Sequence, residues 1–335
     1  MSTTQPPTSE PPPTRLATGA PDSARSAQTG IFGRIRAALD SDLAFEFFHS
    51  PVAIFAALMV LIILSAAMLA PWIAPHDPFN PATLNLMDGF SRPMVANQFT
   101  GTTFLLGTDD QGRDVFSAIL YGARISLFVG FAAVAFGMVL GVGLGLLAGY
   151  RGGWVDAVIM RIADVQLSFP SILVALLIYG VARGFIPPTA REAAAMWVLI
   201  LAIGLSDWVQ FARTVRGVVL VEKEKEYVQA AKLIGVGQLR IMVAHILPNT
   251  LGPVLVIATI GLALAIIAEA TLSFLGVGVP PTQPSLGTLI RIGQGFLFSG
   301  EWWILLFPAL TLLALALSVN ILGDWLRDAL NPRLR

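Results

Sequence analysis

The chain has no cysteine and only three lysines among its 335 residues. Without cysteine it has no disulfides, no thiolate metal sites and no cysteine nucleophile. None of Lys223, Lys225 and Lys232 follows a glycine, so the phosphate-binding loop that ends in Gly-Lys-Ser/Thr is missing. The three histidines form no HExxH pair, and there is no G-x-S-x-G elbow. The sequence therefore predicts no catalytic, cofactor-binding or metal site in this chain.

Charge is also scarce. Only 13% of the residues are charged and 55% are hydrophobic, whereas soluble domains average about 25% charged residues. The mean hydropathy is +0.74. The formal net charge is zero, so the chain as a whole has no field that would attract nucleic acid. This composition indicates a membrane protein.

Long apolar runs account for the charge deficit. A helix needs about 20 residues to cross a hydrocarbon core of about 30 Å. The sequence predicts an all-α integral membrane fold with six spans, at residues 52–70, 125–150, 155–182, 193–212, 246–268 and 302–323. The second span carries glycines at 137, 141, 145 and 149, which predict a smooth groove that another helix can approach closely.

The sequence also suggests how the chain is organised around these spans. Residues 1–30 hold six prolines and are predicted to be a disordered tail. Residues 31–50 fit a helix lying along the membrane surface, or an ordinary solvated lead-in. The other expected parts are a first span with an outer loop (51–124), a core of five spans (125–325), a long inner loop within that core (213–248), and a tail (326–335).

Positive charge predicts the orientation. With the N-terminus inside, fifteen of the 21 Lys and Arg residues fall on the inner side. Because inner loops carry the excess of Lys and Arg, both termini are predicted to be cytoplasmic. The outer loops would then lie near residues 72–124, 183–192 and 270–301.

Asp164, Asp207 and Glu269 lie at or near membrane depth. Ionisable groups are costly in lipid and usually face protein or water, so each is a candidate for the transport path. All three lie near predicted span ends, which leaves interfacial or structural roles open.

A turn-rich cluster of mixed charge precedes the second span. Such residues suit a rigid connection held by local ion pairs, or a contact with substrate. The cluster comprises Gly107, Asp109, Gly112, Arg113 and Asp114.

The largest predicted inner loop has two helical stretches separated by Gly235 and Gly237. In the first, one apolar stripe follows the i, i+3, i+4, i+7 spacing. Its members are Tyr227, Ala230, Ala231 and Ile234. Such a helix could insert into a cleft on a cytoplasmic partner, or fold back on its own bundle.

This loop resembles the EAA loop of the permeases of ATP-binding cassette (ABC) importers. The matching positions are Glu226, Ala230, Ala231, Gly235 and an Ile-Leu-Pro that ends at Pro248. The resemblance implies a coupling helix that docks on an ATPase subunit. Four further stretches are similar to the "C" type permeases of dipeptide, oligopeptide and nickel importers: LLGTDDQGRDVFSAILYGARISL (105–127), AGYRGGWVDAVIMRIAD (148–164), SFLGVG (273–278) and NILGDWLRDALNPRLR (320–335).

The resemblance implies a multi-pass subunit of the bacterial inner membrane that forms half of a path for peptides. Its expected partners are a homologous permease, two cytoplasmic ATPases that bind ATP and Mg²⁺, and an extracytoplasmic substrate-binding protein. Nickel, glutathione or another small solute is an alternative substrate. Other classes that fit a membrane bundle are an ion-driven secondary transporter, which should show inverted repeats, and a scaffold or membrane-embedded enzyme.

Overall fold

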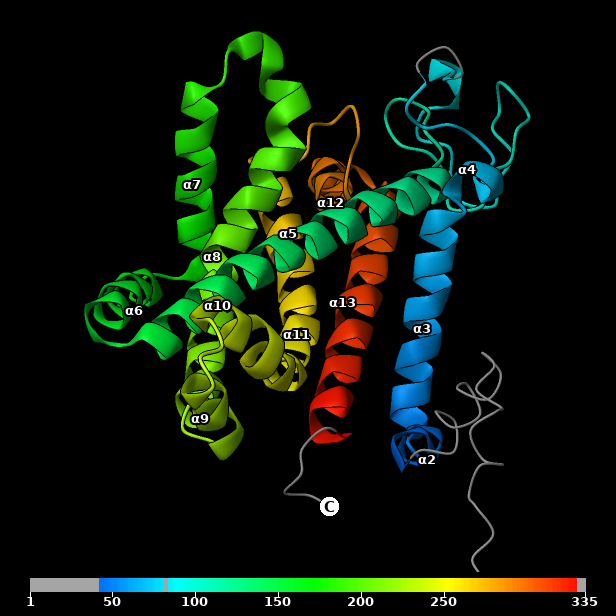
Figure 1. Ribbon diagram of the computed structural model, residues 1–335. Helices are drawn as coiled ribbons and strands as arrows, with labels where there is room; N and C mark the ends of the chain where they lie inside the picture. The colour runs from blue at the N-terminus through cyan, green and yellow to red at the C-terminus, as the bar shows by residue number, and fades with distance from the viewer. Residues whose placement is uncertain (1–41, 81–83, 330–335) are drawn as a thin grey trace, which may run out of the picture. The chain divides into compact units, whose positions relative to one another are not determined.

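Figure 1 shows the computed structural model of the chain, which describes residues 42–80 and 84–329. The chain divides into two compact units, Met1–His49 and Ser50–Arg335. The described part of the first unit is helix α2 (Asp42–His49), which falls within the helix predicted over 31–50. The predicted tail 1–30, residues 31–41, and the last six residues of the predicted tail 326–335 lie outside the described residues.

The second unit consists of helices joined by loops, with two isolated β-bridges and no strand among its described residues. Its helices in chain order are α3 (Pro51–Met68), α4 (Ala70–Ile73), α5 (Val115–Arg151), α6 (Gly153–Leu167), α7 (Ser171–Phe185), α8 (Arg191–Glu222), α9 (Glu226–Leu233), α10 (Gln238–Arg240), a π-helix (Ile241–Ile246), α11 (Leu247–Phe274), α12 (Leu286–Gln294) and α13 (Trp303–Ala329). Three short 3-10 helices complete it: Leu86–Asp88, Pro188–Ala190 and Leu297–Ser299. The all-helical prediction is confirmed.

Five stretches of the described chain are long and apolar enough to cross a membrane. They are Pro51–Met68, Val115–Arg151, Pro188–Glu222, Gln238–Phe274 and Trp303–Ala329. A sixth span exists only if α6 and α7 together form one, and they are bent by 100° relative to each other.

The third predicted span, 155–182, is therefore not one straight helix. Helix α6 ends at Leu167 and α7 begins at Ser171, with Pro170 between them. Proline has no backbone N–H to donate, and it disfavours helical geometry in the residue before it. Pro170 therefore breaks the predicted third span, and the charged helix α6 bends away from the apolar helix α7.

Several helices extend well past their predicted spans. Helix α8 continues to Glu222, ten residues into the predicted loop 213–248. Helix α5 begins at Val115, ten residues before the expected start, so the outer loop before it is shorter than residues 72–124. The Asp114 carboxylate caps this helix by accepting from the Ser117 backbone N–H at 2.9 Å. Helix α13 continues to Ala329, into the predicted tail.

The contact between α5 and α8 is the most extensive in the bundle. The predicted glycine groove of α5 faces α8: a Cβ added at Gly137 would lie 2.8 Å from the Gly204 carbonyl oxygen, and one at Gly145 would lie 2.5 Å from that of Ala212. Gly141 meets the Trp208 carbonyl oxygen in the same way. The two backbones therefore touch directly, and α5 crosses the bundle as a long tilted helix (Figure 1).

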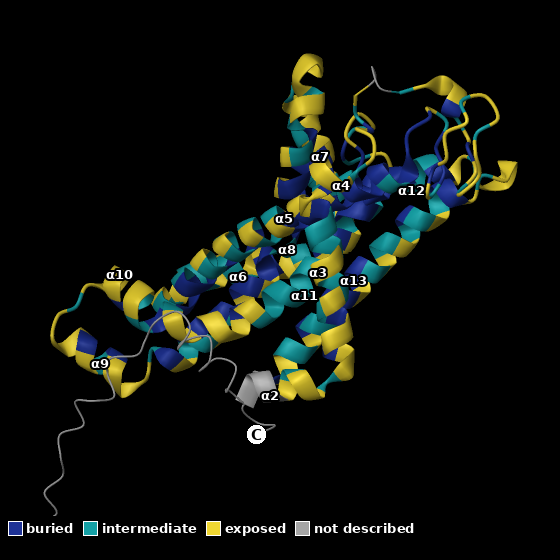
Figure 2. Cartoon of the chain, turned by 90° about the vertical axis from the view of Figure 1, so that its right-hand side faces the viewer, coloured by how far each residue is buried: buried dark blue, intermediate teal, exposed yellow. Residues whose placement is uncertain are grey.

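The unit has two ends that different elements form. At one end lie α9 and α10, and at the other lie α4, α12 and the loop that joins α4 to α5 (Figure 1); we call these the α9 end and the α12 end. Exposed and half-buried residues cover much of α3 and α7 (Figure 2). Their exposed apolar residues, such as Leu61 and Leu177, suit contact with lipid or with another membrane subunit.

The close approach of α5 and α8 leads to a sharp prediction. We expect Gly145→Ala to destabilise the protein by about 1–3 kcal/mol, because its Cβ would overlap α8 and push the helices apart. Gly143→Ala is the matched control: a Cβ at Gly143 would have no atom within 4 Å, and alanine favours helix over glycine by about 0.5–1 kcal/mol. Thermal unfolding of both variants in detergent measures the difference, and equal midpoints would contradict the packing role.

Candidate functional site

The loop between α8 and α11 forms the α9 end. Helix α8 ends at Glu222 and α9 begins at Glu226, so three residues separate them. Gly235 ends the α9 segment with a φ of +79°, a left-handed conformation that favours glycine. The chain then passes through α10 and the π-helix into α11. The segment is thus short and helical rather than a loose loop.

One face of α9 is buried in the bundle. Val228 and Ala231 belong to a hydrophobic cluster that also contains Phe211 of α8, Ile241 of the π-helix and Val254 of α11. Because buried side chains are close-packed, this cluster ties α9 to the π-helix and, through it, to α8 and α11.

Exposed apolar side chains gather where the α9 segment ends and in α10. Leu233 is 89% exposed, Ile234 79% and Leu239 70%, and we call these three residues the tip surface. An apolar surface at a loop end suits another protein, since exposed apolar patches mark interaction sites. The structure thus combines the two alternatives that the sequence left open. Helix α9 packs against its own bundle through Val228 and Ala231, and the segment also exposes apolar residues to which a partner could bind.

The predicted apolar stripe is divided between these two faces. Ala231 is buried, whereas Tyr227, Ala230 and Ile234 are exposed. Sequence reasoning missed Val228, which is fully buried, and Leu233. The i, i+3 spacing of the apolar residues Val228 and Ala231 could have indicated the buried face.

Tyr227 links the two ends of the loop. Its hydroxyl donates to the Glu222 carboxylate at the end of α8 and accepts from the Asn249 side-chain N–H of α11 at 3.0 Å. Burial raises the pKa of Tyr227 above its usual range, and the neighbouring Glu222 carboxylate raises it further. The hydroxyl is therefore protonated at neutral pH and remains a donor.

The two remaining predicted positions of the loop, Glu226 and Pro248, lie at the starts of helices. Glu226 is the first residue of α9 and is exposed, where an acidic side chain interacts favourably with the helix dipole. Pro248 lies in the first turn of α11. Proline is tolerated there because no intrahelical bond needs its missing N–H.

Ion pairs tie α6 to α8 near this end. Arg216 binds Asp156 through two hydrogen bonds, one of 2.6 Å between Nη2 and Oδ2. Arg213 pairs with Asp164. Asp164 is thus an exposed ion-pair partner and lines none of the cavities described below.

Asp207 lies on a cavity of about 330 Å³ between α7, α8 and α11. Its neighbours in the wall include Ser171, Ser206, Gln210 and Thr271. Polar side chains at membrane depth usually face water or a transported solute. Of the three acidic candidates for the transport path, Asp207 is the one that borders a polar cavity.

Glu269 is fully buried. Its two carboxylate oxygens accept hydrogen bonds of 2.7 Å from Ser126 of α5 and Ser273 of α11. The Ser126 hydroxyl also accepts from the Leu286 backbone N–H at the start of α12, at 3.2 Å. The carboxyl group therefore joins three helices and faces no cavity.

The cluster predicted before the second span forms a rigid corner at the α12 end. The Asp109 carboxylate accepts from Arg113 Nε at 2.6 Å, and both side chains are buried. Burial raises the pKa of Asp109, against the opposing effect of the Arg113 guanidinium and backbone N–H groups.

Glycines shape the same corner. Gly107 has a φ of +80°, and a Cβ there would lie 2.6 Å from the Ser91 carbonyl oxygen; Gly112 likewise has a positive φ, of +75°. Trp303 Nε1 donates to the Thr108 carbonyl oxygen at 3.1 Å, which ties the corner to α13. Close backbone packing at the glycines, the Asp109–Arg113 ion pair and the Trp303 hydrogen bond thus hold this corner together.

Two family models match this chain. The model for the binding-protein-dependent transport system inner membrane component matches residues 141–335, from the last turns of α5 to the C-terminus. The model for the N-terminal TM domain of oligopeptide transport permease C matches residues 41–92. The chain belongs to the family of binding-protein-dependent transport system inner membrane components. It is accordingly a multi-pass inner-membrane permease component, and the matched region includes the whole loop between α8 and α11.

Relatives of this permease resemble it over most of their length. The dipeptide transport system permease of Haemophilus influenzae is 37% identical over 87% of this chain and 94% of its own. The di/tripeptide transport system permease of Pseudomonas aeruginosa is 36% identical over 87% of this chain and 91% of its own. The glutathione transport system permease of Pectobacterium atrosepticum is 35% identical over 87% and 90%.

The Tyr227 link yields a prediction about the permease loop. We expect Tyr227→Phe to lower the free energy of opening of α9 by about 1 kcal/mol, the net contribution of a hydrogen bond. Hydrogen exchange of the α9 amides measures that change. Tyr150→Phe is the control, since no hydrogen bond of the Tyr150 hydroxyl is found among the described residues. Similar exchange rates in the two variants would contradict the role of Tyr227.

Proposed function

We propose that this permease forms half of the transport path of an ATP-driven importer for dipeptides and oligopeptides. Its proposed partners are a homologous permease, two cytoplasmic ATPase subunits and an extracytoplasmic substrate-binding protein. The observation that carries the proposal is α9, which is anchored in the bundle by Val228 and Ala231 and exposes an apolar tip surface.

Peptide is the substrate that the relatives favour. Permeases named for dipeptide and for di/tripeptide transport share more than a third of the residues of this chain over most of its length. Glutathione is itself a tripeptide, and the relative named for glutathione transport is nearly as similar. A short peptide backbone is the chemistry that these substrates share.

The coupling step is mechanical in this proposal. The ATPase subunits bind ATP and Mg²⁺, and this chain contributes no catalytic group. When they close, the tip surface of α9 moves with them. The buried face of α9 carries that movement into α8 and α11, which line the polar cavity at Asp207. Rigid-body displacement of packed helices is a common way to open and close a path.

The orientation follows from charge. We place the α9 end in the cytoplasm, because the segment from Arg213 to Arg240 holds six of the 21 Lys and Arg residues. Both termini are then cytoplasmic, and the α12 end faces the binding protein. The rigid corner around Asp109 and Arg113 would give that protein a fixed surface.

Reconstitution tests the function as a whole. The permease is co-expressed with its genomic neighbours, purified in lipid nanodiscs, and assayed for ATP hydrolysis with the binding protein and a panel of peptides, glutathione and nickel chelates. We expect an ATPase to co-purify and peptides to stimulate it. Transport driven by an ion gradient without a bound ATPase would instead establish a secondary transporter.

The tip surface leads to a variant test. We expect Leu233→Asp to weaken ATPase association at least tenfold, the effect of losing one buried contact in an interface. Leu86→Asp is the control, because Leu86 is 77% exposed at the α12 end and gives the same change of residue. The measurement is the amount of ATPase that co-purifies with each variant. Equal losses, or none, would rule out docking at the tip.

The polar cavity leads to a second test. We expect Asp207→Asn to lower the rate of peptide uptake several-fold while the complex still assembles, because a charge facing the path is lost. Asp164→Asn removes a carboxylate from an exposed ion pair and should change little, since such pairs contribute about 0–1 kcal/mol. Uptake into proteoliposomes compares them, and an unchanged rate for Asp207→Asn would remove it from the path.

A further inference from the structure

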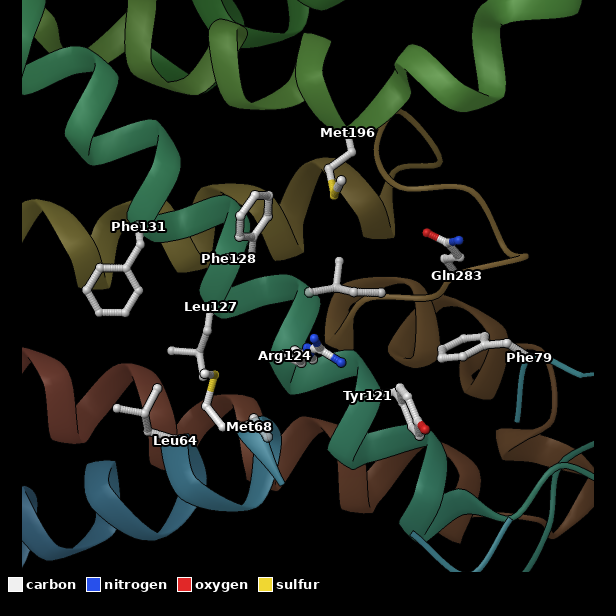
Figure 3. A pocket seen from close by; sticks show the side chains of 12 residues that line it. Leu64, Met68, Phe79, Tyr121, Arg124, Leu127, Phe128, Phe131, Met196 and Gln283 are labelled. Carbon is white, nitrogen blue, oxygen red and sulfur yellow. The ribbon is translucent and has the colours of Figure 1, made fainter. Parts of the chain in front are cut away.

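A second and larger cavity lies at the α12 end. Its volume is about 670 Å³, within the range of about 300–1,000 Å³ typical of small-molecule sites. It lies between the last turns of α3, the first turns of α5, the start of α8 and two loop residues, Phe79 and Gln283 (Figure 3). It is separate from the cavity at Asp207, with which it shares no lining residue.

The cavity wall is mainly aromatic and aliphatic. Tyr121, Phe128 and Phe131 project from one side of α5, as their spacing of three and seven residues requires. Neighbours hold these rings in place: Tyr121 packs edge-on against Phe79 at a ring distance of 5.1 Å, and Phe128 packs against Trp197 at 6.2 Å. The wall can therefore receive an apolar side chain without rearranging.

One cation stands in this apolar wall. Arg124 lines the cavity between Tyr121 and Leu127, and its side chain is exposed (Figure 3). Among the residues that the structure describes, no carboxylate pairs with it and no hydrogen bond of its guanidinium is found, whereas Arg113, Arg213 and Arg216 all have acidic partners. A guanidinium in such a setting binds an oxyanion strongly, through two parallel hydrogen bonds.

We propose that Arg124 binds the C-terminal carboxylate of the peptide as it enters the path, with the aromatic wall receiving the neighbouring side chain. This rests on the proposed function, because it requires peptide to be delivered at the α12 end. The chemistry that fits is a carboxylate attached to an apolar body, and a peptide whose last residue is apolar meets both requirements. Arg124 would thus be a specificity residue for free peptides over amidated ones.

Photo-cross-linking within the assembled importer tests this site directly. The residue p-benzoylphenylalanine replaces Phe131 in the cavity wall, and tritiated leucyl-phenylalanine is cross-linked to the complex in neutral phosphatidylcholine nanodiscs. Unlabelled leucyl-phenylalanine and its C-terminal amide then compete for the site. Because wild type and variants are assembled with the same binding protein, the selectivity of that protein cancels when their occupancies are compared.

We expect Arg124→Gln to weaken competition by the free acid about tenfold or more, as for the loss of a charged hydrogen bond. Competition by the amide should be unchanged, and Arg124→Lys should retain most of the affinity for the acid. Arg92→Gln is the control, since Arg92 is an exposed arginine of the same end that does not line the cavity.

Other outcomes overturn the proposal in distinguishable ways. Equal weakening of acid and amide means that Arg124 only maintains the cavity. Absence of cross-linking in a complex whose ATPase is stimulated by peptide means that peptide does not visit the cavity, while the proposed function stands. If phosphatidylglycerol displaces the peptide, and only when Arg124 is present, the cation binds a lipid headgroup instead. If peptide neither stimulates ATP hydrolysis by the complex nor cross-links to the permease, both this proposal and the proposed function are wrong.

Discussion

The backbone contact between α5 and α8 sets the position of most other parts. In lipid no hydrophobic force drives helices together, because the lipid tails are as apolar as the helix surfaces. Helix association therefore depends on close van der Waals packing. Glycines at 137, 141 and 145 bring the α5 backbone against the carbonyl oxygens of α8. Helix α8 in turn carries α9 at its end and Asp207 in its middle. The location of the coupling loop and of the polar cavity therefore follows from this one contact.

The α9 segment combines two properties that a docking lever needs. Its inner face is part of the same hydrophobic cluster as α5, α8 and α11, and the Tyr227 hydroxyl holds the ends of α8 and α11 together. At its outer end, Leu233 and Ile234 are apolar and largely exposed. A segment anchored only by flexible loops would absorb a partner's movement, whereas a packed one transmits it.

The acidic residues near membrane depth illustrate how environment assigns roles. Asp164 forms an exposed ion pair with Arg213, and Glu269 is enclosed by serine hydroxyls that join three helices. Asp207 borders a polar cavity. Arg124, which the sequence did not single out, is the basic counterpart at the opposite end, in an apolar cavity without an acidic neighbour among the described residues. Only two of the four charges thus face space that a solute could occupy.

The sequence by itself determined the class of fold, most of the spans and the presence of two helical stretches separated by glycine between α8 and α11. Those features depend on local properties: long uncharged runs, helical spacing and the turn conformation at Gly235. The sequence also predicted the glycine groove, but not that α8 fills it. The apolar run at 155–182 suggested one straight span, but Pro170, which is visible in the sequence, separates it into α6 and α7.

Only the tertiary structure decided which side chains share an environment. Periodicity places Ala231 and Ile234 on nearly the same face of a short helix, but it cannot say where the neighbouring helices lie, so the division between buried and exposed faces differed from the predicted stripe. Glu269 and its partner Ser126 are 143 positions apart in the chain, and the wall of the larger cavity includes residues as distant as Leu64 and Gln283. Such contacts depend on helix packing, and no local pattern encodes them.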